Sequence, residues 1–164
     1  MLNAGENTTM KLYLIRHGEA LPRSPDSERP LSERGRADVE RLAAVLALRG
    51  VTAAHVFHSG IARAEQTAVL VAEAVTDDGR CEAQAGLSPN DRVEAVAMES
   101  ERWSDDMVLV GHLPFMDRLA ARLVVGHEDV TLVAFHTSSC LCLERRDDGG
   151  WAVVWMLSPE LLAD

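Results

Sequence analysis

A histidine flanked by an arginine and a glycine follows a short apolar run near the start of the chain. The run Lys11 to Ile15 predicts a buried strand, and Arg16, His17 and Gly18 come where such a strand would end. Ligands of open α/β sheets bind beyond the carboxyl ends of the strands. A histidine there, beside a permanent cation and a flexible turn, could act as a nucleophile toward an anion. The alternative is a strand that ends in polar residues without any chemistry.

Two further strand-to-helix junctions carry residues of the same kind. The segment 58–67 contains Arg63, and Gly111-His112-Leu113-Pro114 follows the apolar run 107–110. If the three strands are parallel and adjacent, two arginines and two histidines meet at one edge of the sheet. This set suits a phosphoryl group, because guanidinium groups bind its oxygens in pairs and a neutral imidazole nitrogen can attack phosphorus.

The rest of the chain alternates between strand and helix patterns. Helices are predicted over 32–49, 61–75, 92–101 and 114–125, and further strands over 53–57, 81–87, 130–135, 139–144 and 151–157. This order predicts an α/β fold, a three-layer α/β/α sandwich whose central sheet is mostly parallel. The turn 147–150 makes the last two strands an antiparallel hairpin at one side. Trp151 and Trp155 are expected on one face of the last strand.

Composition indicates one folded domain over residues 10–164, preceded by a polar, flexible extension over residues 1–9. The chain has 164 residues and is 47% hydrophobic and 26% charged. Its net charge of -10 repels nucleic acid and anionic membranes, so neither is an expected partner. The three cysteines lack the spacing of a metal site and fit a reducing, cytoplasmic setting. We expect no metal and no cofactor, and a monomer or a weak dimer.

Four motifs in order carry a resemblance to a known family. Arg16-His17-Gly18-Glu19, the segment 29–35, the segment 59–67 and Gly111-His112-Leu113-Pro114 resemble the signature of the histidine phosphatase superfamily, also called phosphoglycerate mutase-like. Ser158-Pro159 resembles the carboxyl end of its SixA-type phosphohistidine phosphatases. The resemblance extends over nearly the whole chain, from residue 11 to residue 162, and implies a phosphoglycerate mutase-like fold.

The resemblance also implies roles for individual residues. His17 would be the nucleophile that becomes phosphorylated. Arg16, Arg63 and His112 would bind the phosphoryl oxygens and stabilise their charge in the transition state, and the Leu113 amide would join them at the start of a helix. Arg29, a basic residue beside the expected pocket, is either a substrate contact or a surface residue.

The chain departs from the family at the position of the general acid. Many members carry a glutamate after the third strand, whereas the segment 87–91 has none. Asp91, Asp26 in the proline-rich loop 21–30, and Glu19 are the candidate replacements. An alkoxide leaving group needs a proton, but the imidazole released from phosphohistidine is a better leaving group. Weak acid machinery therefore favours a P–N substrate.

The sequence thus predicts a metal-independent phosphatase that works through a phosphohistidine intermediate on His17 and dephosphorylates phosphohistidine on a protein. A small-molecule phosphomonoesterase of the same superfamily is the alternative substrate class. A non-catalytic phospho-binding module is a further alternative, although it predicts a degraded signature. The chain lacks the long insertions that form lids in the mutases, which argues against mutase action.

Overall fold

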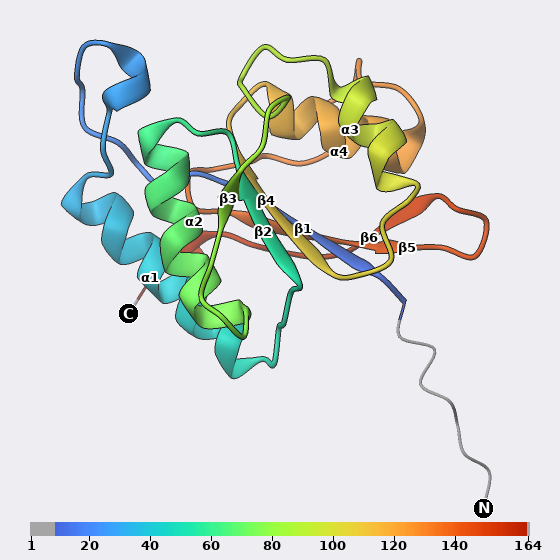
Figure 1. The fold of residues 1–164 in the computed structure, drawn as a ribbon, viewed down its shortest axis with the longest axis horizontal. Helices are drawn as coiled ribbons and strands as arrows, with labels where there is room; N and C mark the ends of the chain where they lie inside the picture. Colours follow the sequence, from blue (N-terminus) through green and yellow to red (C-terminus); the bar gives the residue numbers. More distant parts are fainter. Residues whose placement is uncertain (1–8, 164) are drawn as a thin grey trace, which may run out of the picture.

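A six-stranded sheet organises the molecule (Figure 1). The computed structural model describes residues 9–163. The strands are β1 (Lys11–Arg16), β2 (His55–His58), β3 (Glu82–Ala83), β4 (Met107–Gly111), β5 (Cys140–Arg145) and β6 (Trp151–Leu157); the helices are α1 (Glu33–Leu48), α2 (Ala62–Val75), α3 (Val93–Ser100) and α4 (Phe115–Val125), with 3-10 turns η1 (Asp26–Glu28) and η2 (Pro159–Leu161). Residues 1–8 of the extension expected over 1–9 lie outside the described residues, so that expectation stays a prediction.

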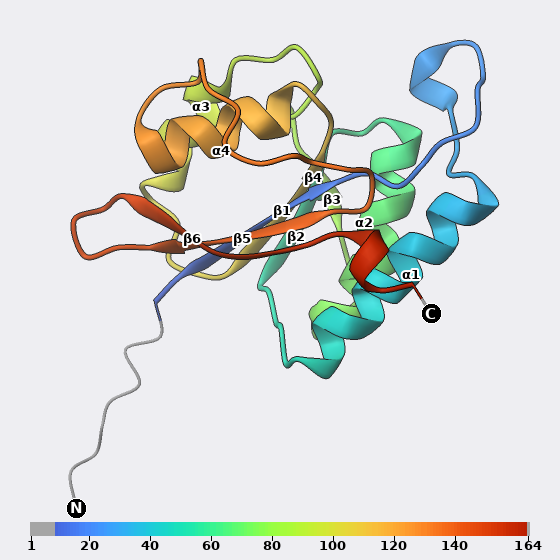
Figure 2. The same cartoon turned by 180° about the vertical axis from the view of Figure 1, so that it is seen from behind.

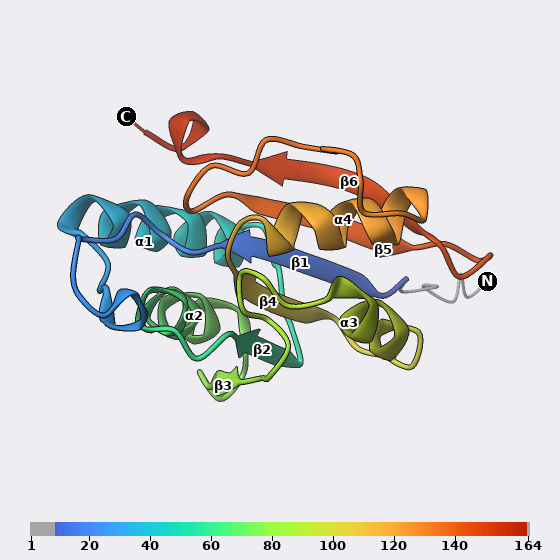
Figure 3. The same cartoon turned by 90° about the horizontal axis from the view of Figure 1, so that it is seen from above.

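The strand order is β3-β2-β4-β1-β5-β6. Strands β3, β2, β4 and β1 run parallel, whereas β5 is antiparallel to both β1 and β6. Figure 3 shows the β5–β6 hairpin on one side of this parallel core. The mostly parallel sheet with a carboxyl-terminal hairpin is therefore confirmed.

Helices cover both faces of the sheet, with α1 and α2 on one side and α3 and α4 on the other (Figures 1 and 2). Alternation along β1 explains how one strand serves both layers: Leu12 and Leu14 pack with α3 and α4, whereas Tyr13 and Ile15 pack with α1 and α2. All four side chains are buried, as expected for a strand with helices on both faces. The three-layer α/β/α architecture is confirmed.

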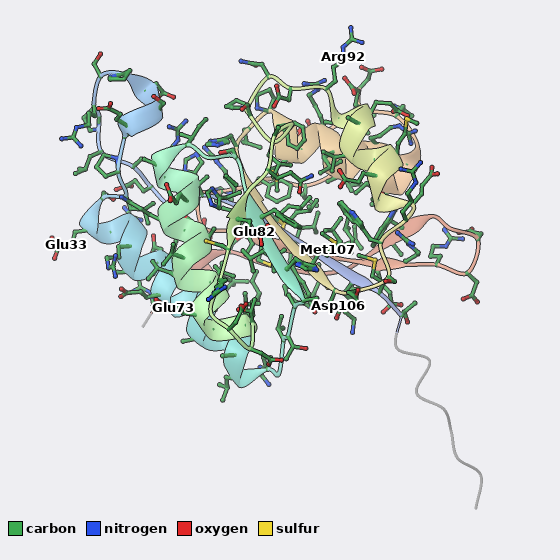
Figure 4. The ribbon with its side chains drawn as sticks, viewed as in Figure 1. Glu33, Glu73, Glu82, Arg92, Asp106 and Met107 are labelled. Atoms are coloured by element: carbon green, nitrogen blue, oxygen red, sulfur yellow. The ribbon has the colours of Figure 1, made fainter. Side chains whose placement is uncertain are left out.

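The carboxyl ends of the three central strands reach the same edge of the sheet. Arg16 at the end of β1 is in register with Gly111 at the end of β4, and His58 at the end of β2 is in register with Val110. Figure 4 labels Asp106 and Met107 at the opposite end, where β4 begins. The fold therefore brings the three sequence junctions together, as the pattern predicted.

The prediction of a strand over 130–135 is wrong. This segment is irregular and crosses above the carboxyl end of β1, where the Phe135 carbonyl accepts a hydrogen bond from Arg16. Its apolar character comes from packing, since Phe135 is buried and Leu132 and Val133 pack against the apolar side chains between the sheet and helices α3 and α4, here called the α3–α4 cluster. The segment has no strand to pair with at this place, because β1 is already flanked by β4 and β5.

The expected common face for Trp151 and Trp155 is also wrong. A register shift in the β5–β6 pairing leaves Val154 unpaired, because Cys142 pairs with Trp155 and Leu143 with Val153. A bulge of this kind reverses the side-chain alternation that follows it. Trp151 packs with the α3–α4 cluster, whereas Trp155 packs with the apolar side chains on the α1–α2 side of the sheet.

No helix over residues 9–163 is long and apolar enough to span a membrane.

Candidate active site

His17 lies just beyond the end of β1 and is nearly buried, with 9% of its surface exposed. Its Nδ1 is 2.7 Å from the carbonyl oxygen of Gly18. Because a carbonyl oxygen only accepts, Nδ1 carries the ring proton and Nε2 keeps a free electron pair. This tautomer makes Nε2 the atom that can act as a nucleophile.

The backbone around His17 is held by helix α2. The Gly18 amide donates to Thr67 Oγ1 at 3.0 Å, and the same hydroxyl donates to the Arg63 carbonyl at 2.8 Å. A side chain at Gly18 would overlap Leu31 and Val39, so the close approach of α1 requires a glycine here. Thr67 therefore links the turn that carries the histidine to the helix that carries Arg63.

Arg63 is buried in the first turn of α2, directly beside His17. Its Nε donates to His17 Nε2 at 3.2 Å. Its Nη1 donates to the Asp26 carbonyl at 3.0 Å, and its Nη2 donates to Asp26 Oδ2 at 3.1 Å. The guanidinium therefore lies where it can bind an oxygen of a group attached to His17 Nε2.

Arg16 is the last residue of β1, and its side chain contacts the segment that crosses above this strand. Its Nη1 donates to the Phe135 carbonyl at 2.7 Å, while its buried Nε has no hydrogen-bond partner among residues 9–163. The backbone carbonyls of Arg16 and His17 both accept from the Ser138 amide. A cavity of ≈ 370 Å³ opens beside Arg16 and is lined by Glu19 and His136 among others.

His112 follows β4 and is 1% exposed. Its ring centre lies 5.0 Å from that of His17, and its Nε2 is 2.6 Å from Ser59 Oγ. Its Nδ1 is buried and has no partner within the described part of the chain. Within residues 9–163, the buried Arg16 Nε, His112 Nδ1 and Ser138 hydroxyl therefore have no hydrogen-bond partner. A bound oxyanion would satisfy such groups.

Burial and neighbouring cations keep both histidines neutral. Burial lowers the pKa of His17 to about 4, and the charges of Arg63, Arg16 and Arg29 lower it too, against the hydrogen bond to Gly18 that raises it. Burial and the neighbouring His17 lower the pKa of His112 to about 3. At neutral pH the site therefore contains two uncharged imidazoles beside two permanent cations.

Two of the candidate acids hold local structure. Glu19 Oε1 accepts from the Ser32 hydroxyl at 2.7 Å, and Ser32 in turn caps α1 by accepting from the Gly35 amide at 2.9 Å. Asp91 Oδ2 accepts from the Ser88 amide at 2.8 Å within its own turn. Glu19 also borders the cavity beside Arg16. Neither carboxylate makes a hydrogen bond to His17, Arg63 or His112 in the described structure.

Asp26 is the candidate acid that reaches the site. Its carboxylate joins Arg63 to Arg29, with the Arg29 Nη1 3.2 Å from Oδ1. The hydrogen bond from Arg29, followed by the charge of Arg63, lowers the pKa of Asp26. Arg29 also donates to the carbonyls of Leu21 and Ala20, so in this structure it holds the 21–30 loop together. A carboxylate paired with two arginines is a poor proton donor.

The expectation that Leu113 begins a helix is wrong. Helix α4 begins at Phe115, and Leu113 lies in the preceding turn together with Pro114. The helix ladder starts with the Met116 amide, which donates to the His112 carbonyl. The Leu113 amide therefore keeps its role as a prediction, without the support of a helix terminus.

Sequence reasoning assigned no role to several groups that build the site. Ser59 and Thr67 lie with Arg63 in the segment 59–67, which resembles a family motif, and this was the signal in the sequence that could have indicated their roles. In the structure Ser59 contacts His112 and Thr67 contacts the Arg63 carbonyl. The contributions of the Gly18 and Phe135 carbonyls come from the backbone, for which a residue pattern gives no signal. Within residues 9–163, no group of three or more histidine, cysteine or acidic side chains could hold a metal ion.

Comparisons with solved structures give the same fold over nearly the whole chain. The protein histidine phosphatase SixA, solved in complex with tungstate, is 27% identical with a TM-score of 0.83, covering 94% of this chain and 100% of that one. A protein from Agrobacterium tumefaciens assigned to SixA is also 27% identical, with a TM-score of 0.75 and coverage of 92% and 99%.

Curated sequences give a shorter match. "Probable phosphoglycerate mutase GpmB" of Yersinia pestis (strain Pestoides F) is 31% identical over 109 residues, which are 60% of this chain and 50% of that protein. The chain therefore spans about half the length of the curated relatives it matches. The family model described as histidine phosphatase superfamily (branch 1) matches residues 12–88.

Fold and site together define an α/β protein with a histidine, two arginines and a second histidine at the carboxyl edge of its sheet. In its fold and in these site residues the chain is similar to proteins of the histidine phosphatase superfamily. The resemblance seen in the sequence motifs is thereby confirmed, including the likeness to SixA proteins.

Proposed function

We propose that the protein is a metal-independent phosphatase that acts through a phosphohistidine intermediate on His17 and removes phosphoryl groups from phosphohistidine on a protein. One observation carries the proposal: His17 Nδ1 is held by the Gly18 carbonyl, so that the free Nε2 lies 3.2 Å from the Arg63 guanidinium. A buried, neutral imidazole with a cation beside its free nitrogen suits attack on an anionic phosphorus.

In the first step His17 Nε2 attacks phosphorus in line with the bond to the leaving group. The Nε2–P bond forms while the leaving-group bond breaks, and its electron pair goes to the departing atom. Arg16, Arg63 and His112 bind the equatorial oxygens, where charge is spread in the transition state. The Gly18 carbonyl stabilises the positive charge that develops on the imidazole ring, because it accepts from Nδ1.

In the second step water attacks the phosphorus of phosphorylated His17. The new O–P bond replaces the P–Nε2 bond, whose electron pair returns to the ring. The protons of the water stay on the phosphate that is released, and His17 returns to its neutral tautomer. Arg16 and Arg63 keep the phosphoryl group in position through both steps, which is the main requirement of phosphoryl transfer.

A protein-bound phosphohistidine is the favoured substrate for two reasons. The relative solved with tungstate, an oxyanion, carries the name protein histidine phosphatase and aligns over its whole length. In addition, Asp91 and Glu19 hold their own local turns, so the acid machinery that a phosphate ester needs is weak. An imidazole leaving group depends least on such an acid.

We place this reaction in the cytoplasm, supported by three free cysteines within the described residues.

The test is hydrolysis, with EDTA present, of a protein that carries labelled phosphohistidine. The proposal expects preferential loss of this label over p-nitrophenyl phosphate and a panel of sugar phosphates. It also expects His17→Ala to abolish turnover, since the nucleophile is gone, and labelled wild-type enzyme to hold an acid-labile, base-stable phosphoryl group. A His17→Ala variant with full activity would contradict the mechanism.

A small-molecule phosphomonoesterase is the second candidate. The match to "Probable phosphoglycerate mutase GpmB" at 31% identity favours a small phosphate ester. Specific activities distinguish the two candidates: faster cleavage of a small monoester than of phosphohistidine supports this second function and overturns the first.

A further inference from the structure

The 21–30 loop places a carboxylate on the arginine that binds beside the nucleophile. The Nε and Nη2 atoms of Arg63 form the edge of a guanidinium that takes an oxyanion in bidentate fashion. In this structure Nε donates to His17 Nε2 at 3.2 Å and Nη2 donates to Asp26 Oδ2 at 3.1 Å. The carboxylate and the attacking nitrogen therefore share one edge of Arg63, and a phosphoryl group bound there would touch both.

The exposed fractions of the two side chains place the Asp26 carboxylate on the solvent side of Arg63. The side chain of Arg63 is 7% exposed, whereas that of Asp26 is 65% exposed. His17 and His112 are buried as well. An in-line attack from His17 sends the leaving group away from this buried floor and toward the solvent. Asp26 would thus lie on the solvent-exposed side of the site, where the leaving group departs.

The contacts of Asp26 allow its carboxylate to move without losing the loop. Its backbone carbonyl accepts from Arg63 Nη1 at 3.0 Å, and this bond does not involve the edge that a phosphoryl group would take. Arg29 holds the other carboxylate oxygen at 3.2 Å and is itself tied to the backbone of the loop. A phosphoryl oxygen bound at Nη2 would displace Oδ2, and rotation of the side chain would then bring the carboxylate to the leaving group while the backbone contact keeps the residue in place.

We infer that Asp26 acts as an anion that selects a substrate whose departing part carries a positive charge before the bond breaks, and thereby favours phosphohistidine protonated on its second ring nitrogen. This inference rests on the proposed function. The Asp26 carboxylate accepts a hydrogen bond from that N–H, so the proton stays on the substrate ring. The P–N bond then breaks with its electron pair on the first nitrogen, and a neutral imidazole leaves without any proton from the enzyme. An anionic leaving group is repelled by the same carboxylate.

The experiment measures kcat/KM for a phosphohistidine peptide, O-phosphoethanolamine and 3-phosphoglycerate. The last two are both esters, with a cationic and an anionic leaving group. Asp26→Asn removes the charge and keeps the shape of the side chain. Glu28→Gln, an exposed acid in the same η1 turn, removes an equal charge from the loop and serves as the matched control.

Asp26→Asn should lower kcat/KM for the phosphohistidine peptide by about 10- to 100-fold, the range for loss of one hydrogen bond to a charged group. It should lower kcat/KM for O-phosphoethanolamine in the same direction and leave 3-phosphoglycerate unchanged or faster. Glu28→Gln should change none of these ratios. An equal loss on all three substrates would show that Asp26 only supports Arg63, and a larger loss on the esters would show a general acid; both results overturn the inference. Wild-type enzyme that cleaves both esters but not the peptide would overturn the proposed function itself.

Discussion

At the scale of single residues, the site depends on two imidazoles kept neutral in a strongly cationic place. His17 is surrounded by Arg63, Arg16 and Arg29, and each of these charges opposes protonation of the ring. A protonated His17 would have no electron pair on Nε2 and could not attack phosphorus. The arginines that we propose to bind the phosphoryl group therefore also help to keep His17 unprotonated.

The lowered pKa values predict how the protein responds to acid. Burial lowers the pKa of native His17 to about 4, whereas the pKa of an ordinary histidine is 6.5. Between these values the unfolded chain binds more protons than the native one, so the free energy of unfolding falls as the pH decreases through this window. Heteronuclear NMR of the imidazole nitrogens should show both His17 and His112 neutral at pH 5, with His17→Asn and His112→Asn to identify the signals. A titration midpoint near 6.5 for His17 would contradict the role given to burial.

At the scale of elements, Thr67 in helix α2 and Thr76, the residue that caps its carboxyl end, make the same pair of bonds in different places. Thr67 donates to the carbonyl four residues earlier and accepts from the Gly18 amide at 3.0 Å. Thr76, at the carboxyl end of the helix, donates to the Ala72 carbonyl and accepts from the Gly79 amide at 2.9 Å. Only the first pair reaches the turn that carries His17, so the two positions separate a stabilising role from a functional one.

Thr67→Val should therefore lower activity as well as stability. Valine keeps the shape of threonine but leaves the buried Gly18 amide without an acceptor, which costs about 1–3 kcal/mol. It also releases the backbone beside His17, so kcat should fall by about tenfold or more, as misplaced catalytic groups do. The measurements are urea unfolding and initial rates, with Thr76→Val as the matched control, which should lose stability and keep kcat. Equal kcat in both variants would show that Thr67 does not position His17.

Some of these elements were predictable from the sequence and others were not, for physical reasons. The strands before Arg16 and His112 were clear, because buried parallel strands are short apolar runs that end in polar or glycine residues. The run 130–135 has the same composition, but its apolar side chains pack as a loop, and composition alone does not distinguish the two. The contact between Asp26 and Arg63 was not predictable either, because it joins a loop to a helix 37 residues away.

At the scale of the whole molecule, a small cationic site is set in an acidic protein. The net charge is -10, although Arg16 and Arg63 make the floor of the site positive. The attraction of these arginines acts at short range and in a buried place, where salt screens it little. The repulsion from the rest of the molecule acts through solvent over longer distances, and an approaching phosphate dianion meets it first.

Salt should therefore speed the capture of small anionic substrates. From about 10 mM to about 150 mM ionic strength the Debye length falls from about 30 Å to about 8 Å, which removes the long-range repulsion and leaves the contact with the arginines. We expect kcat/KM for 3-phosphoglycerate, whose leaving group is also charged, to rise over this range, with little change in kcat. Initial rates in sodium chloride test this, and sodium gluconate controls for chloride binding at Arg16 and Arg63. A fall of kcat/KM in both salts would show that the local cations, and not the net charge of the protein, decide the encounter.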